Sequence, residues 1–122
     1  MRAPPPDIVL LAAEWQPRAL LRAQLIEEGF DVVATDTWDA MRRLLRPGSK
    51  PSLAIVDLQG LTDPDRVLSD LKVLMTPHRV LVLTALTTVA PNQVHALGFR
   101  VVGRPIPIGD VVAAVRAIRE EH

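Results

Sequence analysis

Five short apolar runs alternate with amphipathic stretches along the whole chain, and this alternation is the feature that most limits its fold. The runs lie at residues 8–11, 30–34, 53–56, 80–83 and 101–102. A short, continuous apolar run is typical of a strand that is buried on both faces of a parallel sheet. Strands that alternate with helices are joined by right-handed crossovers into such a sheet. We therefore expect a doubly wound α/β fold.

The stretches between these runs carry apolar residues at helical spacing. Gly29 follows the first stretch and Gly98 follows the fourth, and glycine is common directly after a helix. The helices are expected at residues 17–28, from Asp36 or Thr37 to Pro47, from Val67 to Leu74, at residues 91–97, and from Pro107 or Asp110 to the C-terminus. Five βα units in 122 residues indicate one domain, 1–122, with residues 1–6 as a flexible N-terminus. The flavodoxin-like strand order 2-1-3-4-5 is the expected winding.

Composition excludes several classes of function. The 14 basic and 14 acidic residues balance, so the chain lacks the positive charge that nucleic acid or an anionic membrane surface attracts. It contains no cysteine, which excludes disulfides and thiolate metal sites. The apolar runs are too short for a signal peptide or a membrane span. A cytoplasmic protein without a nucleic-acid or membrane partner is the expectation.

One aspartate, Asp57, follows the third apolar run directly. In open α/β sheets, ligands bind just beyond the carboxyl ends of the strands. The first, fourth and fifth runs end in residues 12–14, 84–85 and 104–105. We expect these segments to meet around Asp57.

Together these segments resemble the receiver domain of two-component response regulators, and the resemblance covers essentially the whole chain. The shared residues are Arg18, Leu21, Leu25 and Gly29, the Val-Asp-Leu at 56–58, the Leu-Thr-Ala at 83–85, and a basic residue before Pro105. The resemblance implies a flavodoxin-like (CheY-like) fold. It implies that Asp57 occupies the phosphoacceptor position, while Thr84 occupies the switch position that contacts the phosphoryl group. In that family an acidic pair after the first strand binds Mg²⁺, and a lysine precedes the proline.

The chain departs from this pattern where the family binds metal. The acidic pair falls on Ala12 and Ala13, and Arg104 stands where the lysine should be. Mg²⁺ requires oxygen ligands, which a methyl side chain does not supply. Only Glu14 and Asp57 remain as weak candidate ligands. The resemblance therefore implies an atypical receiver, or pseudo-receiver, with weak or absent Mg²⁺ binding and no other cofactor.

A receiver of this kind is expected to signal through contacts with a histidine kinase or an output protein, and not to act as an enzyme. A working receiver phosphorylated on Asp57 remains an alternative. A small flavodoxin-like enzyme or nucleotide-binding protein is an alternative of another class. It is disfavoured because no loop has the glycine-rich spacing that cradles phosphate, and no nucleophile–base pair is visible.

Two further expectations concern contacts. A guanidinium can bind a carboxylate bidentately, so Arg104 is expected to pair with Asp57 and hold the site in one state. An Arg104 side chain that points to solvent is the alternative. The last helix carries Val112, Ala113 and Ala117 beside its core stripe, and this second apolar stripe predicts a homodimer. A wide core stripe covered by neighbouring elements is the alternative. Trp15 and Trp38 mark either a partner surface or packed rings at loops and helix starts.

Overall fold

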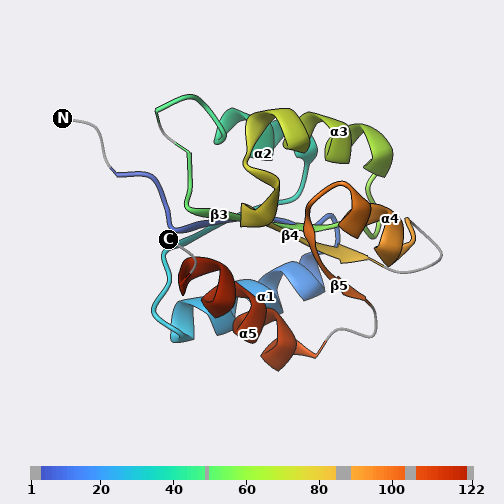
Figure 1. Ribbon diagram of the computed structural model, residues 1–122. Helices are drawn as coiled ribbons and strands as arrows, with labels where there is room; N and C mark the ends of the chain where they lie inside the picture. Colours follow the sequence, from blue (N-terminus) through green and yellow to red (C-terminus); the bar gives the residue numbers. More distant parts are fainter. Residues whose placement is uncertain (1–3, 49, 85–88, 104–106, 121–122) are drawn as a thin grey trace.

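The computed structural model describes residues 4–48, 50–84, 89–103 and 107–120, and within them a parallel sheet lies between two layers of helices (Figure 1). The sheet order is β2-β1-β3-β4-β5, as expected. The strands are β1 (Ile8–Leu11), β2 (Val32–Thr35), β3 (Leu53–Asp57), β4 (Val80–Thr84) and β5 (Arg100–Gly103). The helices are α1 (Trp15–Glu27), α2 (Trp38–Arg43), α3 (Pro64–Leu74), the 3-10 turn η1 (Pro77–Arg79), α4 (Pro91–Ala96) and α5 (Ile108–Glu120).

The uninterrupted apolar runs serve two cores, one on each face of the sheet. In β1, Val9 and Leu11 face the core under α2, α3 and α4, while Ile8 and Leu10 face the core under α1 and α5. All four side chains are at most 1% exposed. Alternate residues of a strand point to opposite faces, so a strand covered on both sides must be apolar throughout.

The first helix and the second strand begin at other residues than the pattern predicted. Helix α1 begins at Trp15, because Pro17 falls in the first turn, where a missing N–H costs nothing. Strand β2 begins at Val32, because Phe30 belongs to the end of α1. Its N–H donates to the Leu25 carbonyl at 3.1 Å, beyond Gly29 at φ 94°. That backbone arrangement closes helices, and it places the Phe30 ring in the core.

The structure of α5 contradicts part of the expected second apolar stripe. Val112 is only 8% exposed, so it belongs to the buried side of α5 together with Val111 and Val115. Ala113 and Ala117 do lie on the exposed side. Val112 cannot serve as an exposed dimer residue, which leaves two small side chains on that stripe. The wide-core alternative therefore holds for Val112.

None of the helices in the described part of the chain is both long enough and apolar enough to cross a membrane.

Candidate functional site

The candidate site lies at the carboxyl edge of the sheet, where β3 ends in Asp57. The last residue pair between β1 and β3 is Leu11 with Val56, so the chain positions that follow, Ala12 and Asp57, lie side by side at the edge. Asp57 is 2% exposed. Its Oδ1 accepts a hydrogen bond from the Gln59 backbone N–H at 3.0 Å, which turns the carboxylate over the start of the β3–α3 loop. The carboxylate is thus held inside the molecule.

Ala12 and Ala13 form the side of the site where the resemblance places two carboxylates. Ala12 is fully buried, and the Ala13 methyl lies over Gly60, 3.3 Å from the point that a Cβ on that glycine would occupy. Gly60 has φ 80°, a conformation that other residues rarely adopt. The β1–α1 and β3–α3 loops therefore pack closely, with methyl groups where a metal-binding receiver would have oxygen atoms.

Arg18 holds the alanine loop in place, a role that the sequence pattern did not predict. Its Nη1 donates to the Ala12 carbonyl at 2.8 Å and to the Ala13 carbonyl at 3.3 Å. The side chain reaches back from α1 over the loop that precedes it. The sequence indicated Arg18 only as one of the residues shared with receiver domains. Its contacts could not be predicted, because the sequence does not show which carbonyl groups a long side chain will reach.

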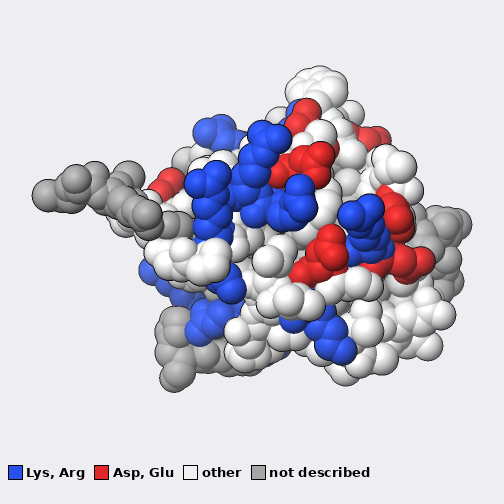
Figure 2. Space-filling model, turned by 90° about the horizontal axis from the view of Figure 1, so that it is seen from above, with Lys and Arg blue, Asp and Glu red and all other residues white. Residues whose placement is uncertain are grey.

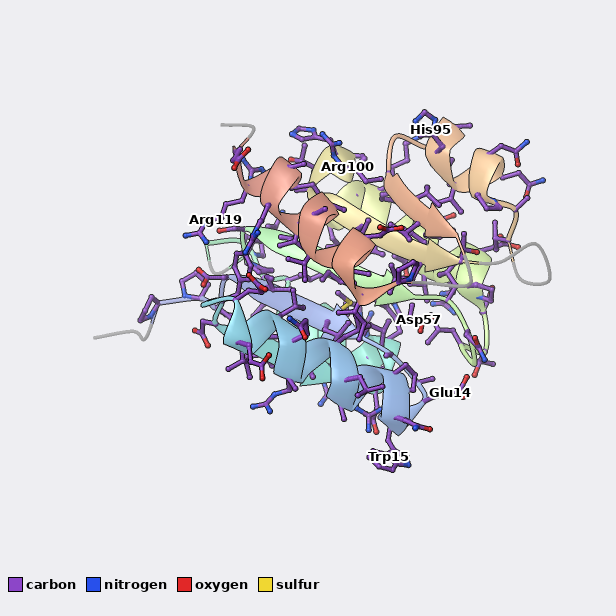
Figure 3. All side chains as sticks on the ribbon, turned by 90° about the horizontal axis from the view of Figure 1, so that it is seen from below. Glu14, Trp15, Asp57, His95, Arg100 and Arg119 are labelled. Carbon is purple, nitrogen blue, oxygen red and sulfur yellow. The ribbon has the colours of Figure 1, made fainter. Side chains whose placement is uncertain are left out.

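Glu14 lies on the same edge of the sheet as Asp57 (Figure 3). It precedes α1 and is exposed, and its side chain makes no capping hydrogen bond. Its Oε1 lies 4.0 Å from the point that a Cβ on Gly60 would occupy, so the carboxylate leans across the β3–α3 loop. A carboxylate at this position is favoured by the positive end of the α1 dipole whether or not it binds metal.

Thr84 ends β4 on the other side of Asp57 and is 1% exposed. Its Oγ1 donates to the Val89 carbonyl at 2.5 Å, so the hydroxyl joins the end of β4 to a residue that lies shortly before α4. This contact matches the structural reading of a β-branched strand residue that secures a loop. The switch role of Thr84 stays a prediction. Arg104 lies outside the described residues, so its pairing with Asp57 is also a prediction.

The oxygen ligands that the described residues offer at this edge do not fit Mg²⁺. The ion prefers octahedral oxygen coordination, usually with one or two carboxylates beside waters. Here one carboxylate is buried and bonded to a backbone N–H, and the other stands exposed beyond two methyl groups. Across the described residues, no three His, Asp, Glu or Cys side chains gather in a way that could hold a metal ion.

A groove of about 360 Å³ opens beside the site, between the first turns of α2 and α3. Ala13, Trp38 and Leu61 contribute its apolar part. Its charged rim includes the ion pairs Arg42–Asp39 at 3.5 Å and Arg66–Asp70 at 4.0 Å. Figure 2 shows acidic and basic side chains intermixed on this face. Trp38 packs against the core, whereas Trp15 is 71% exposed, so the two tryptophans differ in role.

Comparison with known proteins identifies the fold. No protein-family model and no curated protein sequence matches the chain. The receiver domain of NtrX from Brucella abortus is similar over 95% of this chain and 100% of its own, with a TM-score of 0.80 and 18% identity. Full-length FixJ from B. japonicum is similar over 98% of this chain and 60% of its own (TM-score 0.76, 20% identity). An adenylate cyclase from Rhodopirellula baltica is similar over 91% of this chain and 84% of its own (TM-score 0.74, 20% identity). At these identities the likeness concerns the backbone, and it shows that the chain has the flavodoxin-like fold found in response regulator receiver domains.

Proposed function

We propose that this protein is an atypical receiver domain that acts in the cytoplasm through protein–protein contacts, with degenerate or absent Mg²⁺-dependent phosphorylation. The observation that carries the proposal is the pairing of a retained, buried Asp57 with methyl groups at Ala12 and Ala13. The fold supports the receiver part of the proposal, and the altered edge supports the atypical part.

Phosphoryl transfer to a carboxylate brings negative charges together, and enzymes of this chemistry offset them with metal ions and cations. The described part of this edge offers Asp57 little of that help, because the oxygen ligands at two key positions are gone. Asp57 is also 2% exposed, so a phosphodonor must first open the edge to reach it. Both features weaken a phosphorylation cycle without removing the aspartate.

The outward side of α1 supports the protein-contact part. Trp15 is 71% exposed, Leu20 is 53% exposed and Ile26 is 43% exposed. All three lie outside the core side of α1, which Leu21 and Leu25 fill. At 3.6 residues per turn, Trp15 and Ile26 share one flank of the helix and Leu20 lies on the other. Tryptophan is enriched among the residues that dominate binding energy, so the flank with Trp15 and Ile26 is the surface that supports the proposal. A histidine kinase or an output protein is the class of partner proposed for this surface.

The test is phosphorylation with acetyl phosphate and Mg²⁺, read by intact-protein mass spectrometry. Wild type is compared with Ala13→Asp and with the Ala12→Asp/Ala13→Asp double variant. We expect no added phosphoryl group on wild type, and a gain on the double variant that disappears when Asp57→Asn is added. Phosphorylation of wild type on Asp57, dependent on Mg²⁺, would refute the degenerate site. Because Ala12 is fully buried, the single Ala13 variant guards against a folding defect in the double variant.

A working receiver is the second candidate, and the position of Glu14 favours it. Its carboxylate leans over the loop that follows Asp57, where a rotation could bring it toward an ion. In this case wild type becomes phosphorylated and Glu14→Gln abolishes the reaction. Phosphorylation that survives Glu14→Gln would exclude Glu14 as the replacement ligand.

A further inference from the structure

The groove between the first turns of α2 and α3 offers apolar surface to an occupant. It measures about 360 Å³. Three apolar side chains that line it come from three segments: Ala13 from the β1–α1 loop, Leu61 from the β3–α3 loop and Trp38 from the start of α2. Each of them is only partly buried, so part of each side chain is open to contact from outside.

Trp38 adds an aromatic surface to the groove. One part of the side chain packs against the core of the α2–α4 layer, and another part lines the groove. Among aromatic side chains, tryptophan attracts a cation over its ring most strongly. It is also enriched among the residues that dominate the binding energy of interfaces. The groove thus combines apolar contact with a preference for a positively charged group.

The charged residues around the groove give it a negative balance. Among the described residues, four carboxylates and two guanidinium groups line it. Each guanidinium is already paired with one of these carboxylates, Arg42 with Asp39 at 3.5 Å and Arg66 with Asp70 at 4.0 Å. The charges of each pair cancel, so the balance depends on the two carboxylates that remain.

These two carboxylates are Asp36 and Asp63. Asp36 is exposed, and within the described part of the chain it makes no hydrogen bond or ion pair. Asp63 caps α3, where its Oδ1 accepts a hydrogen bond from the Arg66 backbone N–H at 3.2 Å. The positive ends of the α2 and α3 dipoles correspond to about half a unit charge each, which is less than these two negative charges together. Just outside the lining, Glu14 and Arg18 add one charge of each sign. The groove therefore attracts a cation.

We propose that this groove binds a basic segment of a partner protein, in which an arginine lies beside a branched apolar residue. The arginine contacts Trp38 and is attracted by Asp36 and Asp63, while the apolar neighbour contacts Leu61 and Ala13. The volume is at the small end of the range for ligand clefts, so it suits two neighbouring side chains of a segment. The groove is separate from the α1 flank and does not depend on phosphorylation of Asp57.

The experiment is a fluorescence titration of the Trp15→Phe variant, in which Trp38 is the only tryptophan. The probe is the peptide acetyl-Leu-Arg-amide, without Mg²⁺ or a phosphodonor, so the result is independent of the phosphorylation test. We expect a saturable change in Trp38 emission. Acetyl-Leu-citrulline-amide has nearly the same shape and no charge, so it should bind about tenfold more weakly. Equal affinity for the two peptides, or no saturable change within the solubility of the probe, would overturn the proposal.

Salt provides a second test of the charge. Raising the ionic strength from about 0.1 M to about 1 M shortens the screening length from about 10 Å to about 3 Å. Binding of the arginine peptide should weaken, while binding of the citrulline peptide should change little. An arginine peptide that binds equally well at both ionic strengths would contradict the role of the carboxylates.

Variants locate the charges that matter. In the Trp15→Phe background, Asp36→Asn and Asp63→Asn should each weaken binding of the arginine peptide about fivefold, the effect of one exposed ion pair. Asparagine is also a good helix cap, so Asp63→Asn keeps the start of α3 intact. Asp110→Asn is the matched control, because Asp110 is an exposed carboxylate in the first turn of α5, on the other face of the sheet (Figure 1). It should bind the peptide like its parent.

Two results with these variants would overturn the proposal. The first is unchanged affinity in the Asp36→Asn/Asp63→Asn double variant. The second comes from sedimentation velocity: self-association of wild type that disappears in Asp36→Asn would show that a second copy of the chain fills the groove in place of a separate partner.

Discussion

Replacing Arg18 tests whether one side chain from α1 holds the loop that shapes the candidate site. Arg18→Met keeps most of the apolar stem and removes the guanidinium that donates to the carbonyls of Ala12 and Ala13. The 2.8 Å contact is a full hydrogen bond, whereas the contact at 3.3 Å is long and contributes little. Ala12 is buried, so its carbonyl group cannot easily replace the lost guanidinium with water. The expected loss of stability is therefore that of one hydrogen bond to a charged group.

That bond sets the size of the effect. Hydrogen bonds to charged groups contribute about 1.5–3 kcal/mol when buried, and partial exposure of this one lowers the expected loss to about 1–2 kcal/mol. For a domain of this size, 1 kcal/mol corresponds to a Tm change of about 3–6 °C. Arg18→Met should thus lower the Tm by roughly 3–12 °C.

The assay is urea and thermal unfolding followed by tryptophan emission. Trp15 begins α1 directly after the loop and so reports on it. Arg22→Met is the matched control, because Arg22 is an exposed arginine of the same helix, and its loss should change stability by less than about 0.5 kcal/mol. If Arg18→Met and this control have the same Tm, the hydrogen bonds from Arg18 to the loop contribute nothing to stability and the reasoning fails. The stability of Arg18→Lys should lie between those of Arg18→Met and Arg22→Met, because an ammonium group keeps the charge but reaches fewer acceptors than a guanidinium.

Three further predictions address metal, the pairing of Asp57 and self-association. Calorimetry should detect no saturable Mg²⁺ binding in the low-millimolar range, and aspartates at both Ala12 and Ala13 should raise the affinity; tight binding by wild type would contradict this. Asp57→Asn keeps an acceptor for the Gln59 N–H, so it tests the charge alone. If Arg104 pairs with Asp57, the loss of stability should exceed the ~1 kcal/mol of an exposed pair, because Asp57 is buried. A clear rise in Tm would argue against that pair. Ala113→Glu should shift a dimer to monomer in sedimentation velocity, and a wild type that is monomeric at high concentration would remove the α5 dimer.

The sequence predicted which residues lie at the site, but not the contacts that their side chains make. Asp57 could be placed at the carboxyl edge because a buried strand precedes it, and Ala12 lies beside it because β1 and β3 run in register. The contact from Thr84 to the Val89 carbonyl and the grip of Arg18 on the alanine loop were not predictable. Both depend on the direction in which a side chain turns, and the spacing of residues carries no information on that direction.

The sequence by itself determined the layered architecture, while the strand order 2-1-3-4-5 was expected only as the usual winding of five such units. Apolar runs such as Leu53–Val56 cannot meet water on either face, so they must become inner strands of a sheet covered on both sides. Only the tertiary structure decided that Phe30 closes α1 and that Val112 belongs to the core. Each of these depends on how tightly side chains from distant segments fill the same space. Periodicity is a property of neighbours along the chain, whereas packing is a property of neighbours in space.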